Sequence, residues 1–374
     1  MGFRGEMVIV SLMFFVVLGI EVVAGRTHSS LQESEIDRQL KLLNKPALKT
    51  IQTQYGDIFD CVDINKQPAL DHPLLANHTI KMKPSSYPVW REEDAPLKNP
   101  LSLVMLGKER CPTGTVPIRR TSREELISAQ NIQNLNQKRY ISSLFTKRGH
   151  YHGSSVNITT NNPRVIKYQT STARVRLWGG SMFEISFIEA GWLVSPRTFG
   201  DQRTRFYAYW TSGMRGCYNI FCPGFVQISQ TTPVGAVLDP ISIYNDTQYQ
   251  IKVTIFGDKK NQHWWLSLNE ETIGYWPMSI LVDFQDTAEF VEWGGEATGP
   301  ANLLSSAMGS GYFPKEGEGI AGKFRNVFIL NETLYEAYPL EDVLYTQSTN
   351  PACYSVSDRR DWYSFFYYGG PGFC

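Results

Sequence analysis

The chain has 374 residues, and its 36 Lys and Arg side chains are balanced by 36 Asp and Glu side chains, so its formal net charge is zero. A neutral chain lacks the basic excess that nucleic-acid binding requires, and no nucleic-acid partner is predicted. About 350 residues without a signal sequence is too long for one ordinary domain and fits two.

The N-terminus carries an apolar run at residues 7–20 (MVIVSLMFFVVLGI), preceded by Arg4 and followed by the small-residue exit Val22-x-Ala24. This pattern predicts a signal peptide over 1–24, and the run is too short for a membrane span. No later apolar run approaches membrane length. The mature protein is therefore expected to be soluble and secreted, without membrane attachment.

Modification signals agree with that compartment. An oxidising compartment favours disulfides for the six cysteines. A tight loop is expected between Cys217 and Cys222, and a C-terminal pair between Cys353 and Cys374, while Cys61 and Cys111 either pair with each other or stay free. Four N-x-[ST] sequons are candidate glycosylation sites: Asn77, Asn157, Asn245 and Asn331.

The region 25–130 is polar and rich in proline, with one short amphipathic helix predicted from the spacing of Ile36, Leu40 and Leu43. The segment 131–162 is predicted to be a linker and the start of the mature chain. Its basic pairs at 138–139 and 147–148 are candidate processing sites, or else residues of exposed loops.

From residue 163 to 374 the pattern changes to strands. QIKVTIF alternates apolar and polar residues, and the turn GDKKNQ and the run HWWLSL follow it, which predicts a hairpin. Further runs rich in β-branched and aromatic residues include RFYAYWTS, FVQISQ, ETIGYWP and KFRNVFIL. Turn signals recur about every ten residues, so an all-β sandwich or barrel is predicted.

Several familiar sites are absent from the sequence. It contains no H-E-x-x-H and no G-x-S-x-G, and His150-x-His152 has no third ligand nearby, so neither a metal nor a cofactor is predicted. The string GEGIAG at 317–322 precedes a strand pattern rather than a helix, and it is interpreted as a glycine-rich loop.

Acidic residues in apolar stretches are the remaining candidates. In SMFEISFIEAGW, strand alternation places Glu189 on the same face as Phe187 and Ile185, a face that is expected to be otherwise apolar, and leaves Glu184 as a solvent-facing acid. In FVEWGGE, Glu292 and Glu296 lie an even number of positions from Phe290, so strand alternation places all three on one face. Alternation therefore does not show which of the two glutamates is the candidate site residue. The glycines at 294–295 would allow close approach of a backbone or a substrate.

Two carboxyl groups in such surroundings can share one proton, because burial and a second carboxylate both raise a pKa. One then activates a water as general base while the other protonates the leaving group, which serves hydrolysis of an amide or a glycoside. The alternative is a structural role, with each buried glutamate bonded to a Trp N–H or to backbone amides.

The N-terminal half contains DINKQPALDHPLLANHTIKMKPSS and CPTGTVPIRRT. The C-terminal half contains, in this order, IEAGW, YWTSG, GCYNIFCPGFVQ, PISIYN, VEWGGE, MGSGYFPKEG and FYYGGPG. These ordered blocks resemble the plant neprosin family, a family of glutamic peptidases whose namesake cleaves after proline, and the two N-terminal blocks resemble that family's activation peptide.

The resemblance implies a sandwich of two antiparallel sheets, of the jelly-roll or lectin-like kind, with a cleft across one face. It implies that 25–130 is a prosegment removed at acid pH and that 163–374 is the peptidase domain. Its disulfides match Cys217–Cys222 and Cys353–Cys374. Its catalytic glutamates match Glu189 and Glu296, with Glu292 as the fallback for the second position.

The chain departs from the family at one place. Fifteen residues before Glu189, many members resemble SQIW, with a glutamine that helps bind the water or the oxyanion, whereas this chain has ARVR, with Arg174 at the glutamine position. Arginine is a permanent cation that binds carboxylates bidentately, so Arg174 is expected to lower the pKa of Glu189 and to tie it into an ion pair, unless its side chain points to solvent.

Three functions follow from these patterns. The first is a secreted acid endopeptidase made as a zymogen, with Glu189 as base and Glu296 as acid. The second is a catalytically impaired extracellular module that binds proline-rich proteins or peptides on the same fold. The third, ranked last, is a glycoside hydrolase. Four tryptophans are candidates to line a cleft for a proline ring, although core packing is the expected role of most of them: Trp178, Trp192, Trp210 and Trp293.

Overall fold

The structure is a computed structural model, and it describes residues 34–89, 101, 103–104, 106, 109–132, 137–181, 184–213, 215–281, 286–357 and 364–374. The predicted signal peptide lies outside the described residues. Within these ranges, no helix has both the length and the apolar character that crossing a membrane requires.

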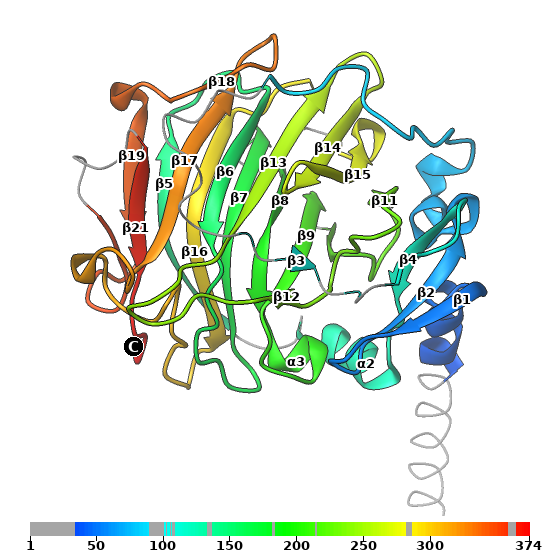
Figure 1. The fold of residues 1–374 in the computed structure, drawn as a ribbon, viewed down its shortest axis with the longest axis horizontal. Helices are drawn as coiled ribbons and strands as arrows, with labels where there is room; N and C mark the ends of the chain where they lie inside the picture. The colour runs from blue at the N-terminus through cyan, green and yellow to red at the C-terminus, as the bar shows by residue number, and fades with distance from the viewer. Residues whose placement is uncertain are drawn as a thin grey trace, which may run out of the picture.

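Two antiparallel sheets form a sandwich, as the strand patterns predicted (Figure 1). The first sheet has seven strands in the order β10-β9-β8-β7-β16-β5-β19. Its strands are β5 (Gln137–Thr146), β7 (Thr170–Ser181), β8 (Glu184–Val194), β9 (Arg205–Ser212), β10 (Arg215–Tyr218), β16 (Phe290–Pro300) and β19 (Leu344–Ser348).

The second sheet has nine strands in the order β11-β15-β14-β13-β6-β17-β21-β20, and β18 pairs with β17. The predicted hairpin is confirmed as β13 and β14, whereas FVQISQ supplies only two strand residues. The strands are β6 (Gly153–Thr159), β11 (Val226–Gln227), β13 (Gln250–Asp258), β14 (His263–Leu268), β15 (Glu271–Pro277), β17 (Gly322–Leu330), β18 (Glu336–Ala337), β20 (Ser355–Val356) and β21 (Phe365–Gly369).

The core lies between the two sheets and is made by alternate residues of each strand. On β7, for example, Ala173, Val175 and Leu177 are fully buried in the core. The indoles of Trp192 and Trp293 fill the same layer. Because side chains alternate along a strand, the even-numbered residues of β7 must lie on the outer face of the seven-stranded sheet.

The prediction that residues 131–162 form a linker is wrong. β5 lies inside the seven-stranded sheet between β16 and β19, and β6 lies inside the nine-stranded sheet between β13 and β17. The basic pair at 138–139 is part of β5 rather than of an exposed loop. The sandwich therefore begins at residue 137 and not at 163. The polar residues of these strands, such as the fully buried Ser142 and Ser154, concealed their strand character.

The described residues between 34 and 132 are here called the N-terminal segment, and most of them form a small unit beside the sandwich, coloured blue to cyan in Figure 1. Its sheet has the order β1-β2-β4, and the predicted helix is confirmed at residues 34–43, where Ile36 and Leu43 pack on Leu126 of α2. The elements are β1 (Ala47–Gln52), β2 (Ile58–Asp63), β4 (Thr115–Arg119) and α2 (Arg123–Ile132). β3 (Leu103–Val104) instead pairs with β12 (Leu238–Asp239), and α3 (Pro196–Phe199) packs near α2.

The described residues also form six short 3-10 turns, and a pair of hydrogen bonds connects the N-terminal segment to the sandwich. The turns are Ile64–Lys66, Pro68–Asp71, Pro73–Leu75, Met278–Ile280 and Pro314–Glu316, and a further one spans Glu341–Val343. The Gln67 side-chain amide donates to the Gln227 carbonyl oxygen at 3.0 Å, and the Gln227 backbone N–H donates to the Gln67 side-chain oxygen at 2.8 Å. This reciprocal pair holds the N-terminal segment to the edge strand β11 of the nine-stranded sheet.

Disulfides join Cys217 to Cys222 and Cys353 to Cys374, and Cys61 of the N-terminal segment pairs with Cys111 rather than staying free.

Three of the four sequons are exposed and remain candidate glycosylation sites: Asn77, Asn245 and Asn331. Asn157 is different, because it lies on the interior strand β6 and is only 1% exposed. A glycan on its amide cannot be accommodated in this fold, so the prediction for Asn157 is corrected.

Candidate functional site

Glu189, Glu292 and Glu296 lie together on the outer face of the seven-stranded sheet. Glu189 does share a face with Phe187 and Ile185, but that face is not the core, since the core residues of β8 are Ile188, Ala190 and Trp192, and Ile185 is 44% exposed. The expectation of an otherwise apolar face is therefore wrong. The structure brings all three candidate glutamates together instead of choosing between Glu292 and Glu296.

Arg174 occupies the centre of this face because both neighbouring strands present glycine to it. In the strand register Arg174 pairs with Gly191 of β8 on one side and with Gly294 of β16 on the other. A Cβ at position 191 would come within 2.8 Å of the Arg174 Cα, and one at position 294 would come within 2.3 Å of the Ser143 Oγ. The glycines therefore give room to the arginine and its neighbours, and Arg174 does not point to solvent.

The Arg174 guanidinium contacts all three carboxylates and is 0% exposed. Its Nε lies 3.1 Å from Glu189 Oε2, and its Nη2 lies 2.7 Å from Glu292 Oε1 and 2.9 Å from Glu296 Oε2. The predicted ion pair between Arg174 and Glu189 is thus present, and it extends to both other glutamates.

Arg176, two residues further along β7, makes a second set of contacts to the same carboxylates. Its Nε lies 2.6 Å from Glu189 Oε2, and its Nη atoms lie 3.3 Å from Glu292 Oε2 and from Glu296 Oε2. A third cation, Arg139 of β5, reaches Glu296 Oε2 at 2.6 Å from the more exposed side. Three cations therefore neutralise three carboxylates.

Two hydroxyl groups add hydrogen bonds to the carboxylates, one to Glu189 Oε1, which no described arginine contacts, and one to Glu292 Oε1, which Arg174 also contacts. The Tyr207 hydroxyl donates to Glu189 Oε1 at 2.9 Å, and the Ser143 hydroxyl donates to Glu292 Oε1 at 2.9 Å. Both donors are fully buried. Buried charges are tolerated only when they are paired and hydrogen-bonded in this way.

The charges fix the protonation state of the cluster. Burial by itself opposes ionisation of Glu292, but attraction by Arg174 and Arg176 outweighs it and lowers the pKa of Glu292. Burial is likewise outweighed at Glu296, where Arg174, Arg139 and Arg176 lower the pKa to about 2. Although burial disfavours its charge, the glutamates hold the pKa of Arg176 well above its usual value. Glu292 and Glu296 are therefore carboxylates in moderately acidic solution as well as at neutral pH.

Arg176, Arg139, Tyr207 and Ser143 were not among the candidates from sequence. Arg176 was detectable, because it follows Arg174 by two positions and must share its face in a strand. Arg139 was assigned to a processing pair, and its role depends on β5, which was not recognised as a strand. Nothing in the local pattern marks Tyr207 or Ser143.

Pairs of aromatic rings surround the charged cluster on the same face. Trp178 stacks on Phe290 with ring centroids 4.2 Å apart, and Phe187 lies 5.5 Å from Tyr209. A third pair stacks at 5.3 Å and joins Phe145 to Tyr345. Of the four candidate tryptophans, only Trp178 lies on this face, and Trp192, Trp210 and Trp293 pack in the core.

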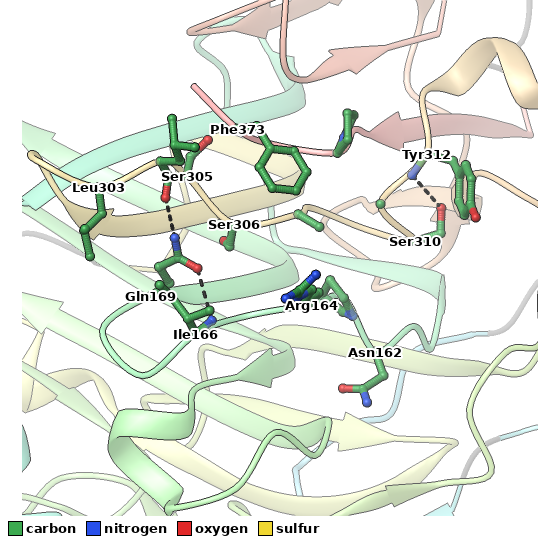
Figure 2. Close-up of a pocket in the computed structure, with 15 residues that line it drawn as sticks. Asn162, Arg164, Ile166, Gln169, Leu303, Ser305, Ser306, Ser310, Tyr312 and Phe373 are labelled. Carbon is green, nitrogen blue, oxygen red and sulfur yellow. Dashed lines mark hydrogen bonds between the residues drawn. The ribbon is translucent and has the colours of Figure 1, made fainter.

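A cavity of about 640 Å³ lies elsewhere, between the loop 162–169, the loop 303–312 and the C-terminal residues 371–373 (Figure 2). Its lining is largely apolar, with the Arg164 side chain pointing into it, and none of the three glutamates contributes to it. The described residues contain no group of three or more His, Cys, Asp or Glu side chains arranged to hold a metal ion.

Comparison with known proteins identifies two family models in chain order. The neprosin activation peptide matches residues 50–157, and neprosin matches residues 167–371. Two crystal structures of scytalido-glutamic peptidase, one with a peptide-based transition state analogue and one with a transition state analogue inhibitor, are 8% and 9% identical, with TM-scores of 0.35 and 0.34. Each covers 63% of this chain and 99% of its own. The β-porphyranase BpGH16B from the human gut bacterium Bacteroides plebeius is 8% identical over 42% of this chain and 54% of its own, with a TM-score of 0.19. These structural similarities are too low to inform the chemistry.

Proposed function

Because the chain belongs to the neprosin family and carries that family's activation peptide, we propose that it is a peptide-binding member whose glutamic-peptidase chemistry is blocked by buried arginines. Its ligands are peptide or protein chains, the substrate class of a peptidase family. It recognises proline-rich segments on the outer face of the seven-stranded sheet and does not hydrolyse them.

One observation carries this proposal: Arg174, with no exposed surface, contacts Glu189, Glu292 and Glu296 simultaneously. Hydrolysis by a glutamate pair needs one carboxylate to activate a water and one carboxylic acid to protonate the leaving group. With a pKa of about 2, Glu296 carries no proton at pH 4. Glu189 Oε2, on which a water would have to be activated, is occupied by the Nε atoms of both arginines.

Peptide binding is supported by the aromatic pairs that flank the cluster. The rings of Trp178 and Phe290 are half-buried, and Tyr345 is 38% exposed, so each presents part of an apolar surface to solvent. Proline-rich segments bind to aromatic surfaces of this kind because their extended conformation is already rigid before binding.

Secretion is part of the same proposal. The apolar run at 7–20 and the exposed sequons at Asn77, Asn245 and Asn331 support export of the chain to the apoplast or to an acidic digestive fluid.

A second candidate function is the acid endopeptidase made as a zymogen. Its support is that both family glutamates, Glu189 and Glu296, are retained and lie on one face, held by the same two arginines. This candidate requires the ion pairs to open when substrate binds.

The test restores the family's residues and removes the extra acid. The variant Arg174→Gln/Arg176→Trp/Glu292→Gln removes two cations and one anion, leaving Glu189, Glu296 and Arg139. Wild type and variant are incubated with a proline-containing peptide between pH 2.5 and pH 6, cleavage is followed by mass spectrometry, and binding is measured by isothermal titration calorimetry. The variant with Glu189→Gln added is the matched control.

We expect the wild type to bind the peptide and leave it intact. The restored variant is expected to cut the peptide, and the Glu189→Gln control is expected to lose that activity. Cleavage after proline by the wild type, lost in its own Glu189→Gln variant, would overturn the proposal in favour of the zymogen peptidase. Absence of binding by a folded wild type would refute both the ligand class and the binding surface.

A further inference from the structure

The cavity in Figure 2 lies at one end of the sandwich, and the glutamate cluster takes no part in it. Three segments enclose it: the loop 162–169 that leads into β7, the loop 303–312 that follows β16, and residues 371–373 that follow β21. Its volume of about 640 Å³ lies within the range of about 300–1,000 Å³ that is typical of pockets for small ligands. Its size therefore suits a small molecule.

Hydrogen bonds fix the walls of the cavity relative to one another. The Gln169 side-chain amide donates to the Leu304 carbonyl oxygen, and the Gln169 side-chain oxygen accepts from the Ile166 backbone N–H at 3.1 Å (Figure 2). The Ser305 carbonyl oxygen accepts from the Phe373 backbone N–H at 3.1 Å. The cavity is therefore formed before a ligand binds, which reduces the entropy lost on binding.

Large hydrophobic side chains around the cavity are exposed to solvent. Their exposed fractions run from 38% for Leu303 to 66% for Phe373, and those of Leu304, Ile166 and Tyr312 lie between these values. Single exposed hydrophobic residues are ordinary on a protein surface, but a group of them gathered around one hollow is typical of a ligand-binding groove. The walls therefore suit the apolar body of a ligand.

Phe373 presents its ring in a backbone conformation that disfavours a bulky side chain. Its φ is +66°, in the left-handed region that such residues rarely adopt. Burial of the ring in the core would offset this strain, but the ring is exposed at the cavity instead. Strained backbone of this kind is concentrated at ligand-binding sites. The conformation of Phe373 therefore supports a binding role for its ring.

Arg164 gives the cavity its charge. Among the fifteen described residues that line the cavity, it is the only one with a charged side chain, and that side chain points inward (Figure 2). Within the described part of the chain its guanidinium has no hydrogen bond or ion pair, in contrast to the arginines of the glutamate cluster. A guanidinium binds a carboxylate through two parallel N–H···O bonds. The cavity therefore suits a ligand with one carboxylate and an apolar body.

We propose that this cavity is a binding site for a small carboxylic acid with an apolar body. The ligand's carboxylate pairs with Arg164, and its body packs against Ile166, Leu304 and Phe373. The site is separate from the outer face of the seven-stranded sheet, so it does not depend on whether the glutamate cluster binds or hydrolyses peptides.

The test uses two probes with the same apolar body and different head groups. Pyrenebutyrate carries a carboxylate, and pyrenebutanol carries a hydroxyl on the same pyrene and chain. Both are titrated at pH 7 into the full chain, and binding is followed by pyrene fluorescence and by isothermal titration calorimetry. We expect the wild type to bind one equivalent of pyrenebutyrate, at least about fivefold more tightly than pyrenebutanol.

Three variants locate the binding. Arg164→Gln is expected to weaken binding of pyrenebutyrate at least about fivefold and to change binding of pyrenebutanol by less than about twofold. Lys167→Gln is the matched control, because Lys167 belongs to the same loop but does not line the cavity, and it should bind both probes like the wild type. Phe373→Gly removes the ring while suiting the backbone conformation, and it should weaken binding of both probes.

Circular dichroism first establishes that each variant is folded. A folded wild type that shows no saturable binding of pyrenebutyrate up to about 1 mM would overturn the proposal. Equal affinity of the wild type for the two probes would overturn it as well, because the carboxylate would then have no partner. Equal effects of Arg164→Gln and Lys167→Gln on pyrenebutyrate binding, or unchanged binding of both probes by Phe373→Gly, would place any binding outside this cavity.

Discussion

At the residue scale, the Tyr207 hydroxyl shows how completely the cluster is satisfied. It is a neutral, fully buried donor to Glu189 Oε1, and burial together with the charge of Glu189 keeps the pKa of Tyr207 well above its usual value. The variant Tyr207→Phe leaves that carboxylate oxygen short of a donor, so we expect the free energy of unfolding to fall by about 1–3 kcal/mol. Urea denaturation at pH 7 measures it.

Tyr345→Phe is the matched control, because Tyr345 lies on the same face but is 38% exposed. Its substitution should change the free energy of unfolding by less than about 0.5 kcal/mol. Equal effects of the two substitutions would contradict a special role for the Tyr207 hydroxyl.

At the element scale, the position of Arg174 depends on how closely β8 approaches β7 at Gly191. A Cβ at position 191 would lie 2.0 Å from the Ala173 carbonyl oxygen, which is backbone and cannot move alone. We expect Gly191→Ala to separate the two strands and to lower the free energy of unfolding by at least about 1–3 kcal/mol. Thermal and urea denaturation of the purified variant measure this loss.

Gly299→Ala is the control at this scale, because the nearest atom to a Cβ there is the Gln169 Cγ at 3.0 Å, a full ångström further away than the backbone oxygen at position 191 and part of a side chain. We expect Gly299→Ala to lower the free energy of unfolding by less than Gly191→Ala does. A stable Gly191→Ala variant would show that the spacing of β7 and β8 is not fixed by this glycine.

At the scale of the whole molecule, the ion pairs of the glutamate cluster make the free energy of unfolding decrease as the pH is lowered. The pKa of Glu296 is about 2 in the folded chain against an ordinary value of 4.5, so its ion pairs stabilise the fold fully above about pH 5, and that contribution is lost as the pH falls towards 2. The shift corresponds to about 3 kcal/mol. Chemical denaturation at pH 5, 4, 3 and 2.5 should show the wild type losing its advantage over the Arg174→Gln/Arg176→Trp/Glu292→Gln variant. If the difference in free energy of unfolding between the wild type and the variant is the same at all four pH values, the lowered pKa of Glu296 is not the source of the wild type's stability.

The parts that were predictable from sequence were those whose signal is local. Alternation identified β13 and β14, and it placed Glu189 correctly on one face with Phe187 and Ile185, although that face is not apolar. Arg174 was singled out by the resemblance to the family's SQIW block and not by strand spacing. β5 and β6 were not recognised, because buried serines and Asn157 occupy positions where strand patterns usually carry apolar residues. The pairing of Arg139 with Glu296 was beyond local reasoning, since 157 residues separate them and only the β5–β16 register brings them together.

The interior place of β5 has a consequence for biosynthesis. β5 is made early, but its partners β16 and β19 lie at residues 290–300 and 344–348. Neither side of β5 can be paired until the ribosome has added about 150 to 200 further residues, and loop closure over such lengths is slow. The N-terminal segment, whose β2 pairs with β1 and β4 and whose Cys61–Cys111 bond is local, can be complete long before that. The nascent chain therefore spends much of its synthesis with an ordered leading unit and an open sheet edge, which is the period in which a chaperone has most to protect.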